Sequence, residues 1–526
     1  MAAGQGGRVG MSALHEPGGS IPASASVDPP GLARRSLVAL KWNYLGMGVK
    51  VLSQLVIGIV LARLLGPEPF GLIAIAWLIL GLGSLIAESG LGVALIQKPH
   101  VSSRDIRYVF SLQMLAGLVL ALLFVALAPL IAAFFGRPDA ALVLRWMSLL
   151  FVLQAFGQTA SALLRRDLNH KRVQLIQIAT YLFAYLLLGL PLAYTGYGVW
   201  ALVIAQLTQA TLFSLGAYLS VRHSLRPAMR ADQPGLLRFG AKVLGSNLTS
   251  WGISNFDAVI IGRMLGVTDL GLYNRSMHLL AAPMNAVVTT LQGVLLPLYS
   301  RLQHRPEAAR DTYLATLCLM SALLAPAFAA IAAMPETTVL ALYGLAWQSA
   351  AVLVTPLALA MPVNAMLAMG GPMMQGLGRA GLEAVSQGIG LLALIVGVIA
   401  AASISLEAVA WVVLAVYCLR AWLVTRLAAG LVSIPASAIL RALAGPLVLA
   451  LFAALLGRLL DIWLAGWLGP GWRFVFVIGL SASAVLLAVL AGGRWLFCAE
   501  ARDMLSRARS HLPHPLNGML AHWSRA

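Results

Sequence analysis

The sequence predicts an all-α integral membrane protein with about fourteen transmembrane helices: two six-helix repeats of the same orientation around a central cavity, plus two C-terminal helices. Three observations predict this class. Hydrophobic residues make up 60% of the chain and charged residues only 10%. Apolar runs of about 20 residues, each long enough to cross ~30 Å of hydrocarbon as a helix, recur along the chain. A short motif from the first half of the chain also returns in the second half.

The apolar runs predict the positions of the helices, and no segment shows the alternation of polar and apolar residues that is typical of a barrel strand. The N-terminal stretch is rich in Gly, Ala, Ser and Pro and contains no apolar run, so we expect disorder there and not a cleaved signal peptide. The expected helices occupy residues 41–64, 70–96, 107–135, 140–163, 173–194, 198–221, 236–262, 269–298, 312–333, 346–369, 382–401, 406–425, 438–459 and 473–496.

The repeated motif divides the chain into two units. RLLGPEPFGL at 63–72 and RMLGVTDLGL at 263–272 share half of their positions, and each lies in a short turn between two long apolar runs. An even number of spans returns the chain to its starting side, so two six-helix units have the same orientation. The predicted units are a disordered cytoplasmic N-terminus (1–33), an N-terminal lobe (34–222), a cytoplasmic linker (223–235), a C-terminal lobe (236–430), two additional helices (431–497) and a basic cytoplasmic tail (498–526).

The net charge of +18 does not indicate nucleic-acid binding, because the basic residues are concentrated in the connections on one side of the membrane. If the N-terminus lies in the cytoplasm, the connections on the cytoplasmic side carry more than three times as many Lys and Arg residues as those on the other side. The positive-inside rule therefore predicts that both termini are cytoplasmic. The basic tail suits anionic lipid headgroups.

Polar residues inside the spans predict the cavity. At 100° per residue, the first and seventh spans each carry a polar face within one arc, and the two faces align through the repeat. The eighth span carries an amide- and hydroxyl-rich stripe. Such residues can also hold helices together, and for any single one this reading stays open. The expected cavity residues are Lys50, Gln54, Lys242, Asn247, Ser250, Ser254, Arg275, His278, Asn285 and Gln292.

Two acids, Glu88 and Asp257, lie clearly inside the spans, where an ionisable group is costly and favours function. Glu88 has no basic neighbour in its own helix, so we expect it to couple transport to protons or sodium ions. Asp257 and Arg275 lie at similar depths in adjacent helices, so Asp257 is expected either to form an ion pair that gates the cavity or to act as a ligand.

Sequence motifs of catalysis are missing. No histidines stand in a metal-binding spacing such as HExxH, and the chain has no P-loop and no GxSxG motif. The three cysteines lie in or at the edge of expected spans and predict neither disulfides nor a metal site. We therefore expect no catalytic residues, no metal and no cofactor beyond a coupling ion, and a transporter driven by an ion gradient, the membrane potential or the substrate gradient.

Three stretches carry a family resemblance: ARLLGPEPFG (62–71), ESGLGVALIQ (88–97) and FDAVIIGRMLGVTDLGLYNRS (256–276). They resemble the polysaccharide-transporter (Wzx-type) flippases of the multidrug/oligosaccharidyl-lipid/polysaccharide (MOP) exporter superfamily, and the resemblance covers about residues 34–430. It implies an inner-membrane protein that moves undecaprenyl-diphosphate-linked oligosaccharides to the periplasmic leaflet by alternating access. The products would be lipopolysaccharide O-antigen, capsule or exopolysaccharide. The expected partners are this lipid-linked substrate, membrane lipids, a polysaccharide polymerase and a chain-length regulator, and not nucleic acid.

Related lipid II flippases are similar at Ala87-Glu88-Ser89-Gly90, but they carry more arginines nearby, where this chain has Gly83-Ser84 and a single Lys50. The difference argues against lipid II as the substrate. It leaves Lys50, Lys242 and Arg275 as the cations expected to attract the diphosphate. The alternatives are a cation-coupled multidrug antiporter of the same superfamily and a membrane enzyme that processes polyprenyl-linked sugars.

Overall fold

The computed structural model describes the whole chain except residues 1–28, 89–94, 97–100, 168, 229–250 and 509–526. The described part contains helices and their connections and no strand. The first helices are α1 (Pro29–Leu65), α2 (Pro67–Glu88), α4 (Ser103–Phe134), α5 (Ala140–Met147), α6 (Leu149–Arg166), α7 (His170–Tyr181), the π-helix η2 (Leu182–Gly189), α8 (Leu190–Tyr194) and α9 (Val199–Val221).

The later part of the chain begins with a helical segment over 251–264, which lies at the edge of the described residues. The helices that follow it are α11 (Val267–Arg301), α12 (Pro306–Ala333), α13 (Pro335–Leu342), the 3-10 helix η3 (Leu345–Ala350), α14 (Ala351–Gly376), α15 (Ala380–Ala402), α16 (Leu406–Val432), α17 (Ala436–Leu464), α18 (Pro470–Leu496) and α19 (Ala499–Ala508).

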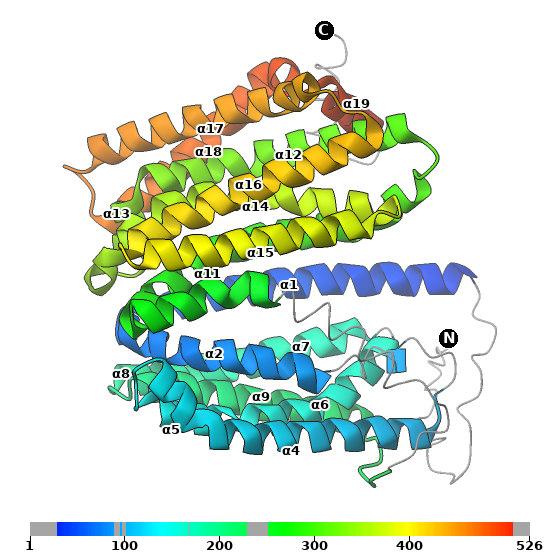
Figure 1. Ribbon diagram of the computed structural model, residues 1–526, viewed down its shortest axis with the longest axis vertical. Helices are drawn as coiled ribbons and strands as arrows, with labels where there is room; N and C mark the ends of the chain where they lie inside the picture. The colour runs from blue at the N-terminus through cyan, green and yellow to red at the C-terminus, as the bar shows by residue number, and fades with distance from the viewer. Residues whose placement is uncertain (1–28, 89–94, 97–100, 168, 229–250, 509–526) are drawn as a thin grey trace, which may run out of the picture.

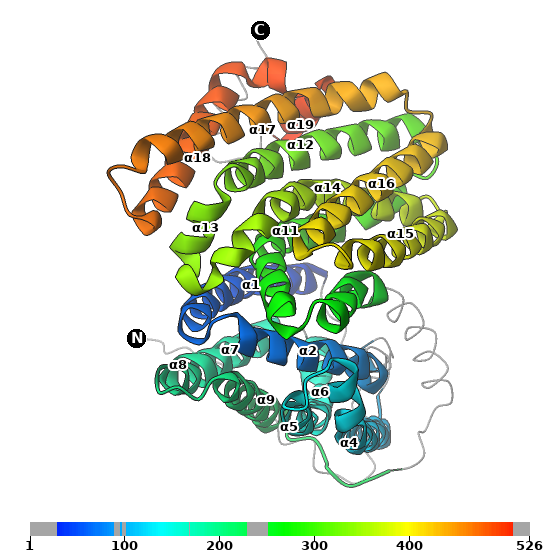
Figure 2. The same cartoon turned by 60° about the vertical axis from the view of Figure 1, so that its left-hand side comes forward.

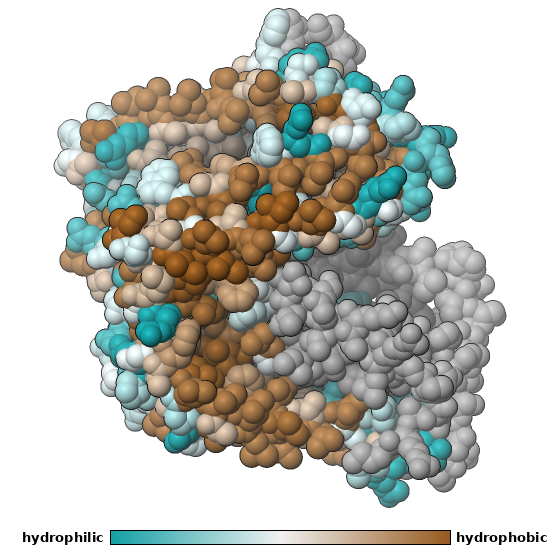
Figure 3. All heavy atoms as spheres, in the orientation of Figure 1, coloured by the Kyte–Doolittle hydropathy of each residue, from teal (hydrophilic) through white to brown (hydrophobic). Residues whose placement is uncertain are grey.

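Thirteen helical stretches of the described residues are long and apolar enough to cross a membrane. They coincide with all the expected spans except the seventh, part of which lies outside the described residues. In the space-filling view, hydrophobic residues cover much of the surface along the helices, and hydrophilic residues gather at the helix ends (Figure 3). A surface of this kind is stable in lipid, so the predicted all-α, multi-pass membrane fold is confirmed.

The helices pack in two groups (Figures 1 and 2). We call α1 to α9 the first group and the segment 251–264 together with α11 to α19 the second group. Helices α1 and α2 of the first group and α11 of the second lie at the boundary between the groups in both views. Helix α2 packs extensively on α11, and α1 contacts α7 and α8 on one side and α11 on the other. The predicted lobe boundaries and the exact repeat arrangement stay predictions.

The repeated motif explains how α2 and α11 approach each other. Gly66 and Gly266 precede the two helices with φ values of 72° and 100°, a region in which only glycine is unstrained. Further along, a Cβ at Gly71 would lie 1.8 Å from the Val267 carbonyl oxygen, and a Cβ at Gly271 would lie 2.1 Å from the Pro67 oxygen. The first turns of the two helices are therefore in backbone contact through glycines that align in the sequence repeat.

The two groups are also joined near the α2–α11 crossing. We call the end of the molecule that holds residues 65–67 and 265–267 the hairpin end; it is on the left in Figure 1. There Trp347 of η3 donates its indole N–H to the Ala62 carbonyl at 2.8 Å, and Arg63 donates from Nε to the Leu342 carbonyl at 2.7 Å. Trp347 also packs edge-on against Phe70 of α2. We call these contacts the hairpin-end latch.

A second set of contacts connects the turn between α4 and α5 to α2 at the hairpin end. Arg137, between α4 and α5, donates to Glu68 of α2 and to Asp139, both at 2.7 Å. Hydrogen bonding to the guanidinium of Arg137 lowers the pKa of the Asp139 carboxyl below its usual value. These groups are solvent-accessible, so the bridge positions the turn and adds little stability.

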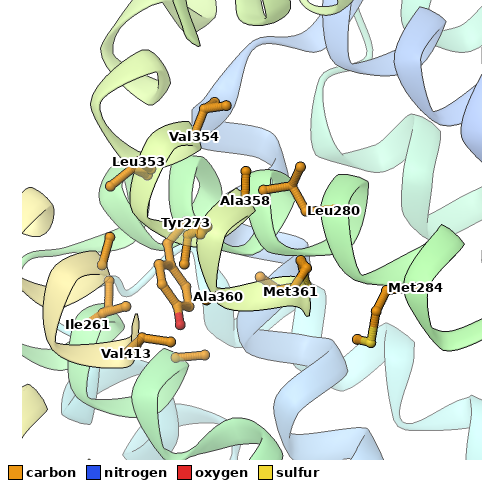
Figure 4. Close-up of a cluster of buried hydrophobic side chains, with 14 of the residues drawn as sticks. Ile261, Tyr273, Leu280, Met284, Leu353, Val354, Ala358, Ala360, Met361 and Val413 are labelled. Carbon is orange, nitrogen blue, oxygen red and sulfur yellow. The ribbon is translucent and has the colours of Figure 1, made fainter. Parts of the chain in front are cut away.

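The buried core of the second group holds α11 in place. Tyr273, Leu280 and Met284 of α11 pack against Met361 and other apolar side chains of α14, as the close-up shows (Figure 4). Because protein interiors are close-packed, α11 has a defined rotation about its axis. That rotation decides which of its polar residues face the first group.

Candidate functional site

A central cavity of about 530 Å³ lies between the two helix groups. Its walls come from α1, α2, α7, η2, α9, α11 and the segment 251–264, and Tyr343 lies at its margin. The volume falls within the usual range of ligand pockets, about 300–1,000 Å³. The polar residues of its lining are Lys50, Gln54, Gln206, Gln209, Asn255, Asn274, Arg275 and His278.

Arg275 is the cation at the hairpin end of this cavity. Its guanidinium carbon lies 5.1 Å from the centre of the Phe70 ring and 5.3 Å from that of Tyr343. Gly58 of α1 leaves room for it, because a Cβ at that position would lie 2.4 Å from Nη2. Its buried Nε has no hydrogen-bond partner among the described residues. Aromatic faces thus hold a guanidinium in the cavity wall without neutralising its charge.

The other cation of the lining, Lys50, is half-buried on α1. Asn274 precedes Arg275 and His278 follows it on the cavity side of α11, and the His278 ring packs edge-on against Trp77 at 6.5 Å. None of the described residues that line the central cavity is Asp or Glu. The described lining therefore favours an anion and offers amide and imidazole groups beside it.

A second cavity of about 410 Å³ lies within the first helix group, between α1, α2, α4, α6, α7 and α9. It adjoins the central cavity, because Lys50, Gln206 and Gln209 line both. Arg165 also lines it. We call it the glutamine chamber for the six amide side chains of its wall: Gln113, Gln154, Gln158, Gln177, Gln206 and Gln209.

Four of the residues predicted from the sequence lie together in the central cavity. They are Lys50, Gln54, Arg275 and His278. Lys242, Asn247 and Ser250 lie outside the described residues, and so does the side chain of Glu88, so their predicted roles stay predictions.

Three other predicted cavity residues have a different location. Ser254 and Asn285 are exposed and line none of the three described cavities. Gln292 donates to the Ala368 carbonyl of α14 at 2.8 Å and lines a separate cavity of about 200 Å³ in the second group. The predicted polar stripe of α11 does not continue along the central cavity, because the later part of this helix, beyond Pro283, packs on α14.

The expected ion pair between Asp257 and Arg275 is not formed. The buried carboxylate of Asp257 accepts hydrogen bonds from the Tyr273 hydroxyl and from the Ala258 backbone N–H. Tyr273 and Arg275 are two residues apart, so their side chains project about 200° apart around the helix. The face of α11 that approaches Asp257 is therefore the Tyr273 face, and Arg275 points to the first group.

Sequence reasoning missed the glutamine chamber. Its signal was the spacing of amides within apolar spans: Gln154 and Gln158 are four residues apart on α6, and Gln206 and Gln209 are three apart on α9. Either spacing places both side chains on one helix face.

The fold and the polar cavities define a class of protein, the all-α, multi-pass membrane proteins that enclose polar cavities. The chain shares its fold with the lipid II flippase MurJ in an inward closed conformation, at a TM-score of 0.66 and 14% identity, over 86% of this chain and 97% of that one. An inward-facing multidrug resistance MATE transporter of the MOP superfamily aligns at a TM-score of 0.57 and 13% identity, over 72% of this chain and 94% of that one. At these identities the likeness concerns the fold alone. A family described as polysaccharide biosynthesis protein matches residues 60–352, more than half of the chain, and the chain belongs to this family.

Curated relatives agree with the family. The succinoglycan biosynthesis transport protein ExoT of Rhizobium meliloti is 32% identical over 55% of this chain and 58% of its own length. The lipopolysaccharide biosynthesis protein WzxC of Escherichia coli is 23% identical over 60% of this chain and 65% of its own length. The chain thus spans less than two thirds of the length of these relatives. The predicted resemblance to Wzx-type proteins is confirmed.

Proposed function

We propose that this protein is a flippase that moves undecaprenyl-diphosphate-linked oligosaccharides across the bacterial inner membrane for surface polysaccharide biosynthesis. The diphosphate occupies the central cavity, where Lys50 and Arg275 attract it, and the polyprenyl tail stays in lipid. Family membership and the names of ExoT and WzxC support a polysaccharide substrate. A polymerase and a chain-length regulator of the same pathway are the expected protein partners.

One observation carries this proposal: the described lining of the central cavity has two cations and no acid. A cation-coupled multidrug antiporter is expected to place an acid in an apolar pocket, which is the opposite polarity. An anionic headgroup gains charge-assisted hydrogen bonds from a lining of this kind. The cavity is therefore better suited to a diphosphate than to a cationic drug.

The hairpin end is proposed to face the periplasm and the opposite end the cytoplasm. Most of the described Lys and Arg residues in connections lie at the opposite end, which supports this orientation through the positive-inside rule. In this proposed orientation, the α2–α11 contact and the hairpin-end latch join the groups at the periplasmic end, which supports a state closed to the periplasm. Transport requires the latch to open and the groups to close at the cytoplasmic end.

The expected energy source is an ion gradient or the membrane potential, and Glu88 remains the proposed coupling acid. Asp257, which is bound to Tyr273, is proposed to hold α11 against the segment 251–264 and to have no part in ion exchange. The role of Glu88 rests on its position within the membrane, where an ionisable group is retained at a cost.

Deletion of the gene in its source strain tests the proposal. We expect loss of a surface polysaccharide and accumulation of its lipid-linked repeat unit. The wild-type gene should restore the polysaccharide and end the accumulation.

The Lys50→Ala protein should reach the membrane but fail to restore export, because the diphosphate loses one of its two cations. The matched control is Arg426→Ala, an exposed cation on α16 that lines none of the described cavities. Normal polysaccharide in the deletion strain would refute the proposed function, and normal export by Lys50→Ala would remove this residue from the site.

A further inference from the structure

We infer that the glutamine chamber is the sugar-binding subsite of the transporter, which takes the hydroxyl-rich part of a lipid-linked oligosaccharide next to its diphosphate. This inference rests on the proposed function, because it assigns the two parts of one headgroup to two adjoining cavities. The diphosphate lies in the central cavity, and the sugars extend from it into the first helix group.

The first support is the concentration of amides in one place. The chamber draws its six glutamines from four helices, α4, α6, α7 and α9. A glutamine side chain offers two N–H donors and one carbonyl acceptor, so it can pair with neighbouring sugar hydroxyls, which both donate and accept. An aromatic face is also present, since Phe213 lines the chamber. Neutral amides can therefore bind a polyhydroxylated ligand that carries no charge.

The second support is that most of these amides are unused by the protein. The side-chain amides of Gln154, Gln158, Gln177 and Gln209 make no hydrogen bond to any described residue. Gln113 is only 1% exposed; its carbonyl oxygen accepts from Thr159 at 2.6 Å, but its buried Nε2 has no partner in the described part of the chain. A buried amide N–H without a partner costs about 1–3 kcal/mol, so its presence in the chamber wall points to a ligand or solvent that pairs with it.

Gln113 and Gln206 each accept a hydrogen bond from a neighbouring helix, but the pattern of the other four glutamines is not that of interhelical glue. Glue residues pair across the helix interface they stabilise. Here the helices are brought together by small residues: a Cβ at Gly157 of α6 would lie 2.6 Å from Ser214 Oγ of α9, and one at Gly117 of α4 would lie 2.7 Å from the Phe151 carbonyl oxygen. The flanking Gln154 and Gln158 are thus left to line the space beside the contact.

The third support is the position of Lys50. It lines both cavities, as do Gln206 and Gln209, so a diphosphate held by Lys50 has its first sugar at the opening of the chamber. Arg165 is a second cation of the chamber wall and no described lining residue is acidic. The subsite therefore accepts neutral sugars and acidic substituents, and it disfavours sugars with free amino groups.

Binding by the purified protein in detergent tests the inference with two probes. One is undecaprenyl diphosphate without sugar; the other is the lipid-linked oligosaccharide extracted from the source strain after deletion of this gene. Gln158→Leu on α6 and Gln177→Leu on α7, which line the chamber but not the central cavity, should each weaken binding of the oligosaccharide about tenfold, the value of one or two net hydrogen bonds. Neither should change binding of the bare diphosphate lipid more than about twofold. Gln348→Leu, an exposed residue of η3 that lines no described cavity, is the matched control.

The outcomes separate the two proposals. If the wild-type protein binds neither probe, the proposed function fails and the subsite fails with it. If the wild type binds both probes and the two Gln→Leu variants bind the oligosaccharide normally, the proposed subsite is refuted, but the proposed flippase function is not. Equal weakening of both probes would make the chamber a structural element and would also overturn the inference. Because the two substitutions lie on different helices, a folding defect in one leaves the other as the test, and the thermal midpoints of unfolding identify such a defect.

Discussion

At the scale of single residues, the local partners of a charged group decide its role more than its depth in the membrane does. Asp257 and Arg275 lie on neighbouring helical segments, yet the first is bound by Tyr273 and the second lies between the rings of Phe70 and Tyr343. Arg275 thus keeps its charge available to the cavity, whereas Asp257 is committed to a contact inside the second group.

This difference predicts how substitutions combine. Asp257→Asn and Arg275→Gln should have additive effects on the free energy of unfolding in detergent, within about 0.5 kcal/mol, because the two side chains share no contact. Asp257→Asn and Tyr273→Phe should instead couple by about 0.5–3 kcal/mol, since their partners are each other. Double-mutant cycles measured by thermal unfolding provide both values. Rescue of Asp257→Asn by Arg275→Gln would contradict this prediction, because it would indicate an ion pair between the two native side chains.

At the scale of the elements, α2 and α11 act as a pair. Their contact depends on Gly71 and Gly271, where no side chain fits between the backbones. The contact lies beside the hairpin-end latch, so one small surface closes this end of the cavity. The closest approach of the two helices thus depends on two glycines, so a single added methyl group is enough to disturb it.

Gly71→Ala should therefore destabilise the closed hairpin end. The added methyl group would lie 1.8 Å from the Val267 oxygen, and overpacking of this kind costs about 1–3 kcal/mol. A cysteine at Leu279, which lines the central cavity, should then react faster with an impermeant maleimide applied from the periplasm. Gly293→Ala in α11 is the control, because a Cβ there meets nothing within 4 Å. Equal labelling of the Gly71→Ala and control proteins would show that the crossing does not hold this end closed.

At the scale of the whole molecule, the distribution of charge supports the proposed orientation, and the two helix groups enclose the central cavity. The groups meet at the hairpin end, and the central cavity lies between them with the glutamine chamber on one side. The polar lining is thus asymmetric, since the chamber belongs to the first group. The second group contributes Arg275, His278 and the close-packed core that holds α11.

The proposed orientation has a direct test in a cysteine-free background. A cysteine at His304, in the connection after α11, should be protected from an impermeant reagent applied to the periplasmic side. A cysteine at Leu345, which is exposed in η3 at the hairpin end, should be labelled. The physical reason is the excess of Lys and Arg in connections on the His304 side. Labelling of His304→Cys but not of Leu345→Cys from the periplasm would reverse the topology.

The sequence by itself determined the membrane class, the positions of the spans and the presence of Lys50, Arg275 and His278 on polar helix faces. These properties depend on local hydropathy and on the helical period, which neighbouring residues set. Only the tertiary structure decided which polar residues meet. The glutamine chamber, the partner of Asp257 and the departure of Gln292 from the central cavity all depend on the rotation and packing of helices that are distant in sequence. Helical periodicity places a residue on a face, but close packing against several other helices decides what that face meets.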